Sequence, residues 1–142
     1  MKDSHRAQIQ IRNAIPSELD EAAEVISAAY KEYASQLPSE MWEQYHSNMK
    51  DVRSRLAESE LIVAGLRGRI VGTVTFYPDG RHYGPPDWPE DLAVLRLLAV
   101  HPDTRGLGIG RSLTDECIKR CKELGIRRVA QEIQENEGLM PP

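Results

Sequence analysis

Short runs of alternating or continuous apolar residues predict the strands of this chain. Polar and apolar residues alternate over residues 8–12, which predicts a first strand. Two runs rich in β-branched residues, 61–66 and 70–77, are separated by a short turn and predict a hairpin. Residues 92–100 are almost continuously apolar, which favours a buried strand, and a further strand is expected to begin within residues 125–130.

Apolar residues in steps of three and four predict three helices. The first is expected to begin at Ser17 as N-cap, and the second to carry one stripe from Trp42 to Leu56. The third follows a glycine-rich turn and ends at Gly125, which suits the position just after a helix. The order strand, two helices, three strands, helix, strand predicts an α/β fold of the mixed, α+β kind.

Composition narrows the class of protein. The 142 residues suit one domain, 1–142, with 131–142 as a polar, divergent or frayed tail. A net charge of −4 argues against nucleic acid as a partner, and no apolar run is long enough for a membrane span. No secretory signal is visible, so we expect a cytoplasmic protein. The two cysteines, Cys117 and Cys121, share one predicted helix and read as core residues, and we predict no metal site.

The turn between the apolar strand 92–100 and the third helix carries the candidate chemistry. Its glycines, Gly106, Gly108 and Gly110, alternate, and Arg105 and Arg111 flank them. A helix start presents unpaired amide groups and the positive end of the helix dipole. Glycines let a ligand approach that backbone closely, so the turn predicts a site for an anion such as a pyrophosphate.

Spacing separates this turn from two nucleotide-binding loops. A dinucleotide-binding loop needs G-x-G-x-x-G, but the third glycine position, counted from Gly106, is Arg111. A P-loop needs a glycine five residues before Gly110, where Arg105 stands. Neither pattern fits.

The pattern R-x-x-G-x-G is filled by Arg105, Gly108 and Gly110, after a strand that ends in L-A-V-H-P. This motif resembles the acyl-CoA-binding turn of the GNAT superfamily of N-acetyltransferases, and the predicted element order resembles the first two thirds of that fold. The resemblance implies a central mixed sheet with flanking helices. It also implies transfer of an acetyl group from acetyl-CoA to an amine of a small molecule or protein. Family habit favours a homodimer.

The resemblance assigns most site residues through their backbone. Leu98 and Val100 would pair with the pantetheine arm, and an amide near Leu98 and Ala99 would stabilise the thioester oxyanion. The pyrophosphate would lie on the turn formed by Arg105, Gly106, Leu107, Gly108, Ile109, Gly110 and Arg111. A carboxylate at the start of the motif strand would accept the proton of the amine, and both Glu90 and Asp91 are candidates.

The resemblance weakens after Val129, because residues 131–142 match neither the final helix nor the closing hairpin of the family. We therefore expect a C-terminally truncated relative, a frame-shifted one, or a fold completed by a partner chain. Two functions follow from this: an N-acetyltransferase, or a non-catalytic acyl-CoA-binding remnant or interaction module. Both predict acyl-CoA binding, and only the first predicts turnover.

Overall fold

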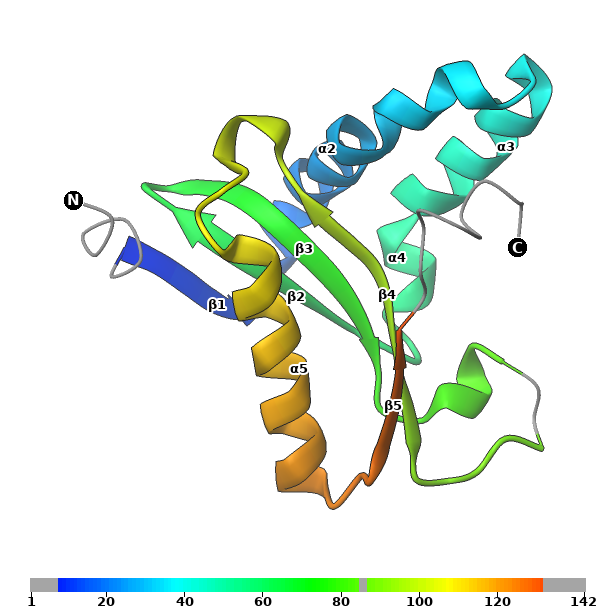
Figure 1. The fold of residues 1–142 in the computed structure, drawn as a ribbon, viewed down its shortest axis with the longest axis vertical. Helices are drawn as coiled ribbons and strands as arrows, with labels where there is room; N and C mark the ends of the chain where they lie inside the picture. The colour runs from blue at the N-terminus through cyan, green and yellow to red at the C-terminus, as the bar shows by residue number, and fades with distance from the viewer. Residues whose placement is uncertain (1–7, 85–86, 132–142) are drawn as a thin grey trace.

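A five-stranded sheet forms the centre of the protein in the computed structural model, which describes residues 8–84 and 87–131 (Figure 1). The strand order follows the sequence, β1-β2-β3-β4-β5. The first four strands pair antiparallel, and β5 pairs parallel to β4. The strands are β1 (Ile9–Asn13), β2 (Glu60–Leu66), β3 (Arg69–Tyr77), β4 (Leu92–Val100) and β5 (Arg128–Gln131). The predicted mixed α/β class is confirmed.

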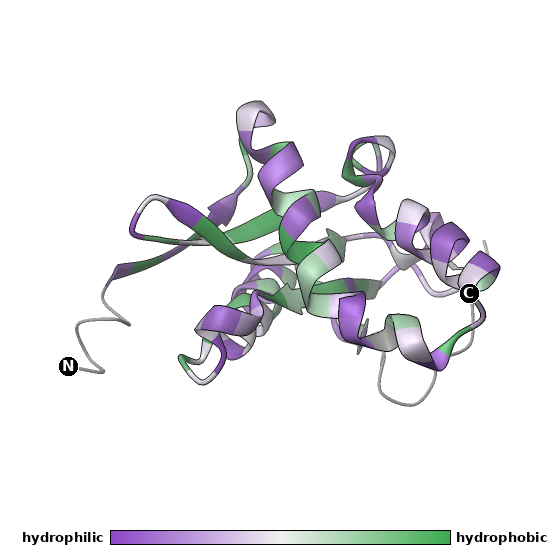
Figure 2. Ribbon diagram, turned by 90° about the horizontal axis from the view of Figure 1, so that it is seen from above, coloured by the Kyte–Doolittle hydropathy of each residue, from purple (hydrophilic) through white to green (hydrophobic). Residues whose placement is uncertain are grey.

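Helices cover both faces of this sheet, and Figure 2 shows the apolar positions concentrated on the strands between them. The α-helices are α2 (Leu19–Tyr30), α3 (Ser39–Lys50), α4 (Val52–Arg55) and α5 (Ile109–Leu124). Short 3₁₀ turns are η1 (Pro16–Glu18), η2 (Lys31–Gln36), η3 (Gly80–His82) and η4 (Pro102–Thr104). One apolar cluster joins α2, α3 and α4 to the sheet, and a second joins α5 to the opposite face.

The two cysteines behave as the sequence predicts. Cys117 and Cys121 are buried, unbonded members of the cluster under α5. Burial raises the pKa of the Cys117 thiol to about 12, so it stays protonated. Within the described residues there is no cluster of ligands that could hold a metal ion, and no helix long and apolar enough to cross a bilayer.

Two predicted helix boundaries are wrong. Ser17 is not an N-cap, because a 3₁₀ turn follows Ile15, and α2 begins at Leu19 after Glu18. The stripe from Trp42 to Leu56 is not one helix either. The backbone leaves the helical region at Asp51, whose side chain accepts a hydrogen bond from the Ser54 amide and starts α4.

The long apolar strand β4 contains an irregularity that the sequence pattern hides. Its register against β3 shifts between Thr73 and Thr75, and Leu97 has a φ of +56°. Ala93 and Leu95 pack on the α5 face before this point, and the side chains of Leu98 and Val100 pack there after it. One extra residue has therefore been inserted, which is a β-bulge.

Candidate functional site

The glycine turn joins the end of β4 to the start of α5. Gly106 and Gly108 have φ values of +87° and +78°, and Gly108 is the N-cap of α5. Left-handed φ values are costly for residues with a Cβ, so glycine is needed at both positions. The first hydrogen bond of the helix is donated by the Ser112 amide to the Gly108 carbonyl, at 3.0 Å. The amides of Ile109, Gly110 and Arg111 precede it and have no acceptor within the helix.

The space in front of this turn is open. An ideal Cβ on Gly106 or Gly108 would meet no described atom within 4 Å other than its chain neighbours. The helix that starts here is 16 residues long, so its positive dipole end adds to the unpaired amides. Arg105 and Arg111 are exposed, and Arg105 Nη2 lies 3.4 Å from Glu32 Oε1. The turn therefore presents positive charge and amide donors to an anion from solvent.

The bulge in β4 lies beside this turn and is tied to α2. The Tyr30 hydroxyl donates a hydrogen bond of 3.0 Å to the Leu98 carbonyl, and Tyr30 is buried. A left-handed Leu97 costs about 1–2 kcal/mol relative to a regular strand. Strained backbone that the surrounding packing holds in place is characteristic of functional sites.

Beyond the bulge, one edge of β4 has no strand partner in the described part of the chain. The ladder between β4 and β5 runs from Leu92 to Leu95, and β5 ends at Gln131. The edge from Leu97 to Val100 spans about 10 Å at the usual rise of a strand and leads directly to the glycine turn. An extended ligand with an anionic end fits this combination of an open strand edge and an amide-rich turn.

The structure does not bring Glu90 and Asp91 to the turn. Both lie at the opposite end of β4, and Leu97 is six positions, about 20 Å of strand, beyond Asp91. Asp91 Oδ1 accepts a hydrogen bond of 2.7 Å from Arg128 Nη2, which lowers the pKa of the Asp91 carboxyl. The Glu90 side chain is 86% exposed, with its carboxylate 4.0 Å from Arg81 Nη1.

A buried polar cluster beside the bulge was missed by sequence reasoning. Arg96 is 6% exposed, its guanidinium carbon lies 5.0 Å from the centre of the Tyr83 ring, and it donates to Asn48 Oδ1 at 3.4 Å. Thr75, its partner in β3, is also buried. The sequence contains one indication of this cluster, a single arginine within the apolar run 92–100. The residues that contact Arg96 could not be predicted, because they come from distant segments of the chain.

Comparison with known proteins identifies the fold and the family. The family model described as "Acetyltransferase (GNAT) family" matches residues 20–139, which is most of the chain. The chain belongs to the GNAT family. Among curated proteins, a mycothiol acetyltransferase from Geodermatophilus obscurus is 31% identical over 94 residues. That match covers 61% of this chain and spans only 29% of the relative.

Solved structures of GNAT proteins share the architecture. The PaiA N-acetyltransferase of Thermoplasma acidophilum, solved with coenzyme A, superposes with a TM-score of 0.71 at 21% identity, covering 92% of this chain and 83% of that one. A GNAT acetyltransferase from Brucella melitensis, solved with acetyl-CoA, gives 0.62 at 22% identity, covering 92% and 79%. At these identities the likeness shows the fold alone.

Proposed function

We propose that this GNAT protein transfers an acetyl group from acetyl-CoA to an amine. The observation that carries the proposal is the continuous path from the open edge of β4 to the amide-rich turn at the start of α5. Coenzyme A is an extended chain that ends in phosphates, and its shape and charge match that path. Family membership and the GNAT structures solved with coenzyme A or acetyl-CoA support the same ligand.

Each part of acetyl-CoA has an assigned place in the proposal. The pyrophosphate lies on the amides of the turn, residues 105–111, with Arg105 and Arg111 beside it. The pantetheine arm adds to the edge of β4 through the backbone of Leu98, Ala99 and Val100. Glycine is needed in the turn because the phosphates must approach its amides closely.

The reaction is a direct substitution at the thioester carbonyl. The neutral amine forms a C–N bond to that carbon, the nitrogen then loses one proton, the C–S bond breaks, and the thiolate of coenzyme A leaves and takes up a proton. The charge that develops on the carbonyl oxygen is stabilised by an amide near Leu98, within the strained segment of β4. The amine must first lose its own proton, because an alkyl ammonium ion has no free electron pair.

Glu90 and Asp91 remain the proposed bases, and because about 20 Å of strand separates them from Leu97, either would have to receive the amine proton through bridging water. Glu90 is the one to test first. Asp91 is held by Arg128, and a carboxylate with a lowered pKa accepts protons poorly. Glu90→Gln is expected to lower kcat/KM at neutral pH. An unchanged kcat/KM would exclude Glu90 as the base.

The second candidate function is acyl-CoA binding without turnover, as a remnant or interaction module. The position of both carboxylates, far from the glycine turn, favours it. Calorimetric titration with acetyl-CoA tests the site, and release of free thiol over a panel of small amines and peptide amines tests turnover. Binding with amine-dependent thiol release supports the enzyme, whereas binding without release supports the module. No binding at excess acetyl-CoA would refute both.

A further inference from the structure

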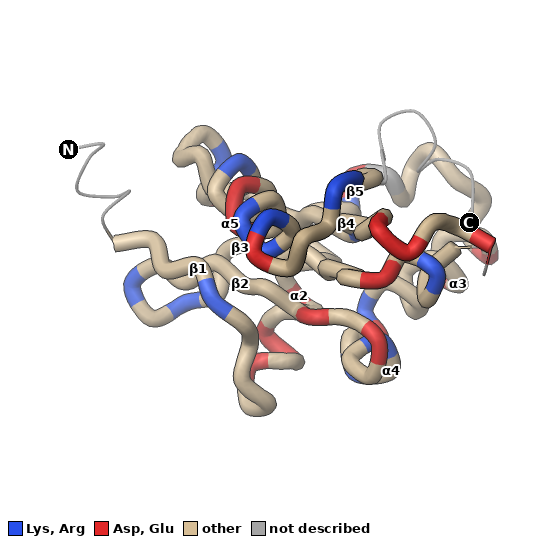
Figure 3. The backbone as a smooth tube through the Cα atoms, turned by 90° about the horizontal axis from the view of Figure 1, so that it is seen from below, with Lys and Arg blue, Asp and Glu red and all other residues tan. Residues whose placement is uncertain are grey.

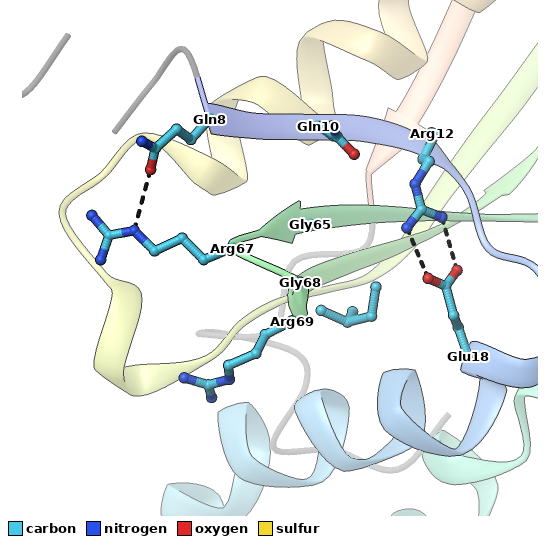
Figure 4. Close-up of a pocket in the computed structure, with 9 residues that line it drawn as sticks. Gln8, Gln10, Arg12, Glu18, Gly65, Arg67, Gly68 and Arg69 are labelled. Atoms are coloured by element: carbon cyan, nitrogen blue, oxygen red, sulfur yellow. Dashed lines mark hydrogen bonds and ion pairs between the residues drawn. The ribbon is translucent and has the colours of Figure 1, made fainter. Parts of the chain in front are cut away.

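A cavity of about 630 Å³ opens between β1, the turn from β2 to β3, and the start of α2 (Figure 4). Its walls are mostly polar. They comprise Gln8, Gln10, Arg12, Glu18, Gly65, Arg67, Gly68, Arg69 and Ile70. The volume lies within the range of small-molecule sites, but those sites are usually apolar, so the ligand that fits here is a polar one.

The strand pattern of β1 creates the polar wall. Ile9 and Ile11 pack toward the cluster under α5, and successive residues of a strand point to opposite faces. Gln10 and Arg12 therefore point to the α2 face, as Figure 4 shows. Opposite Gln10 stands Gly65, which has no side chain to fill the space.

The missing side chain of Gly65 keeps the cavity open. An ideal Cβ on Gly65 would lie 3.8 Å from the Arg69 carbonyl oxygen, 3.9 Å from Arg12 Nη2 and 4.0 Å from the Gln10 carbonyl oxygen. These are ordinary contact distances, so a Cβ at position 65 would fit without a clash. A larger side chain there would project into the cavity that Gly65 lines.

Positive charge dominates the walls, with three arginines against one glutamate. Arg12 and Glu18 neutralise each other through two hydrogen bonds of 2.8 and 2.7 Å. Arg67 Nε donates to Gln8 Oε1 at 3.2 Å. Arg69 is exposed, and no carboxylate among the described residues pairs with it. Figure 3 shows the positive positions gathered at this turn beside β1, in a chain whose net charge is −4.

The cavity is separate from the glycine turn and the bulge. Its lining runs from β1 to the start of β3 and includes no residue of β4 or of the glycine turn. Buried residues of α2, including Ile26, pack against Leu97 and Ala99 and occupy this face of the sheet in between. A ligand here would leave the open edge of β4 unoccupied.

From this geometry we infer that the cavity binds a small organic anion that carries a carboxylate or phosphate group. The Arg69 guanidinium supplies a charged pair of donors, and the side chains of Gln8 and Gln10 supply neutral amide donors. The Arg12 guanidinium is already bound to Glu18, so it lines the cavity and is not one of the donors proposed for the ligand. The inference does not depend on the proposed acetyl transfer.

Two anions test the inference on the ¹⁵N-labelled full chain at low ionic strength: inorganic phosphate and citrate. Saturable shifts of the Gly65 and Gly68 amide signals are expected for at least one of them. The anion that binds more tightly identifies the preferred group. Arg69→Gln is expected to weaken binding about tenfold, because it removes a charge-assisted hydrogen bond. Gly65→Val is expected to weaken binding, because its side chain would occupy part of the cavity.

Lys122→Gln is the matched control, because it removes one exposed positive charge from the far end of α5. It should bind as the parent does. The inference is overturned if Gly65 and Gly68 do not respond to either anion, or if only Ile109 to Arg111 respond. It is also overturned if Arg69→Gln binds as tightly as the control. If Gly65→Val does not give a folded spectrum, the comparison of Arg69→Gln with Lys122→Gln decides alone.

Discussion

Two glycines at opposite ends of α5 form a matched pair for testing the phosphate-binding turn. Gly108 at the N-cap has φ +78° and ψ 18°, and Gly125 at the C-cap has φ +73° and ψ 19°. At both positions, an added Cβ would have no described atom within 4 Å apart from those of the two adjacent residues. Replacing either glycine with alanine therefore imposes the same backbone strain and creates no clash.

The two variants should lose the same stability. A left-handed alanine costs about 1 kcal/mol, which for a domain of this size lowers Tm by about 3 °C. Only Gly108→Ala places a methyl group where the proposed pyrophosphate approaches the turn. The loss of one charge-assisted hydrogen bond there raises the Kd for acetyl-CoA by about 10- to 100-fold. Gly125 lies about 24 Å away along the helix, so its variant should bind normally.

Differential scanning calorimetry measures the two Tm values, and isothermal titration with acetyl-CoA measures the two affinities. The reasoning is refuted if both variants bind within about twofold of the parent, because the turn would then be only structural. It is equally refuted if Gly125→Ala loses as much affinity as Gly108→Ala, because the effect would then come from stability alone.

Three further predictions test the packing and charges around the site. Gly72→Ala would place a Cβ 2.6 Å from a methyl carbon in the first turn of α5, so we expect a loss of about 1–3 kcal/mol in urea unfolding. The Arg12 guanidinium lowers the pKa of Glu18 from 4.5 to about 2. The folded state therefore favours the carboxylate, and this stabilisation is complete above pH 4.5 and is lost as the pH falls toward 2. Arg12→Gln should make the free energy of unfolding depend less on pH between 4.5 and about 2. Glu32→Gln frees Arg105 from its ion pair, so acetyl-CoA should bind about two- to threefold more tightly in calorimetry.

Each of these predictions has a contradicting result. A Gly72→Ala variant as stable as the parent would mean that α5 can move without cost. An acid-unfolding profile that Arg12→Gln leaves unchanged would mean that other carboxylates control stability there. Weaker binding in Glu32→Gln would mean that the ion pair positions Arg105 for the phosphate instead of competing with it.

The glycine turn could be predicted from the sequence because its signals are local. The left-handed backbone of Gly106 and Gly108, the start of α5 and its end at Gly125 all depend on neighbouring residues. The order of the strands along the chain was also predictable, because each strand coincides with its own alternating or apolar run. The bulge at Leu97 was not, because a strand that is apolar on both faces shows no period whose phase could shift.

Interactions between distant segments explain why two features could not be predicted, and a local capping interaction explains a third. The Glu18 carboxylate is bound to Arg12 of β1, and no local pattern in the sequence indicates this pair. The cavity beside it combines β1, a hairpin turn and a helix start, which only the folded sheet brings together. The stripe from Trp42 to Leu56 has helical spacing throughout, and spacing alone does not reveal the break at Asp51.

The extra residue at Leu97 divides β4 into two segments whose side chains follow opposite parity. Up to Arg96, odd-numbered residues such as Leu95 face α5; after Leu97, even-numbered residues such as Leu98 do. Deleting Leu97 would therefore restore regular alternation and leave Leu98 and Val100 on the α5 face and Ala99 on the α2 face. Such a deletion would remove the bulge while the other β4 residues keep their places in the two apolar clusters.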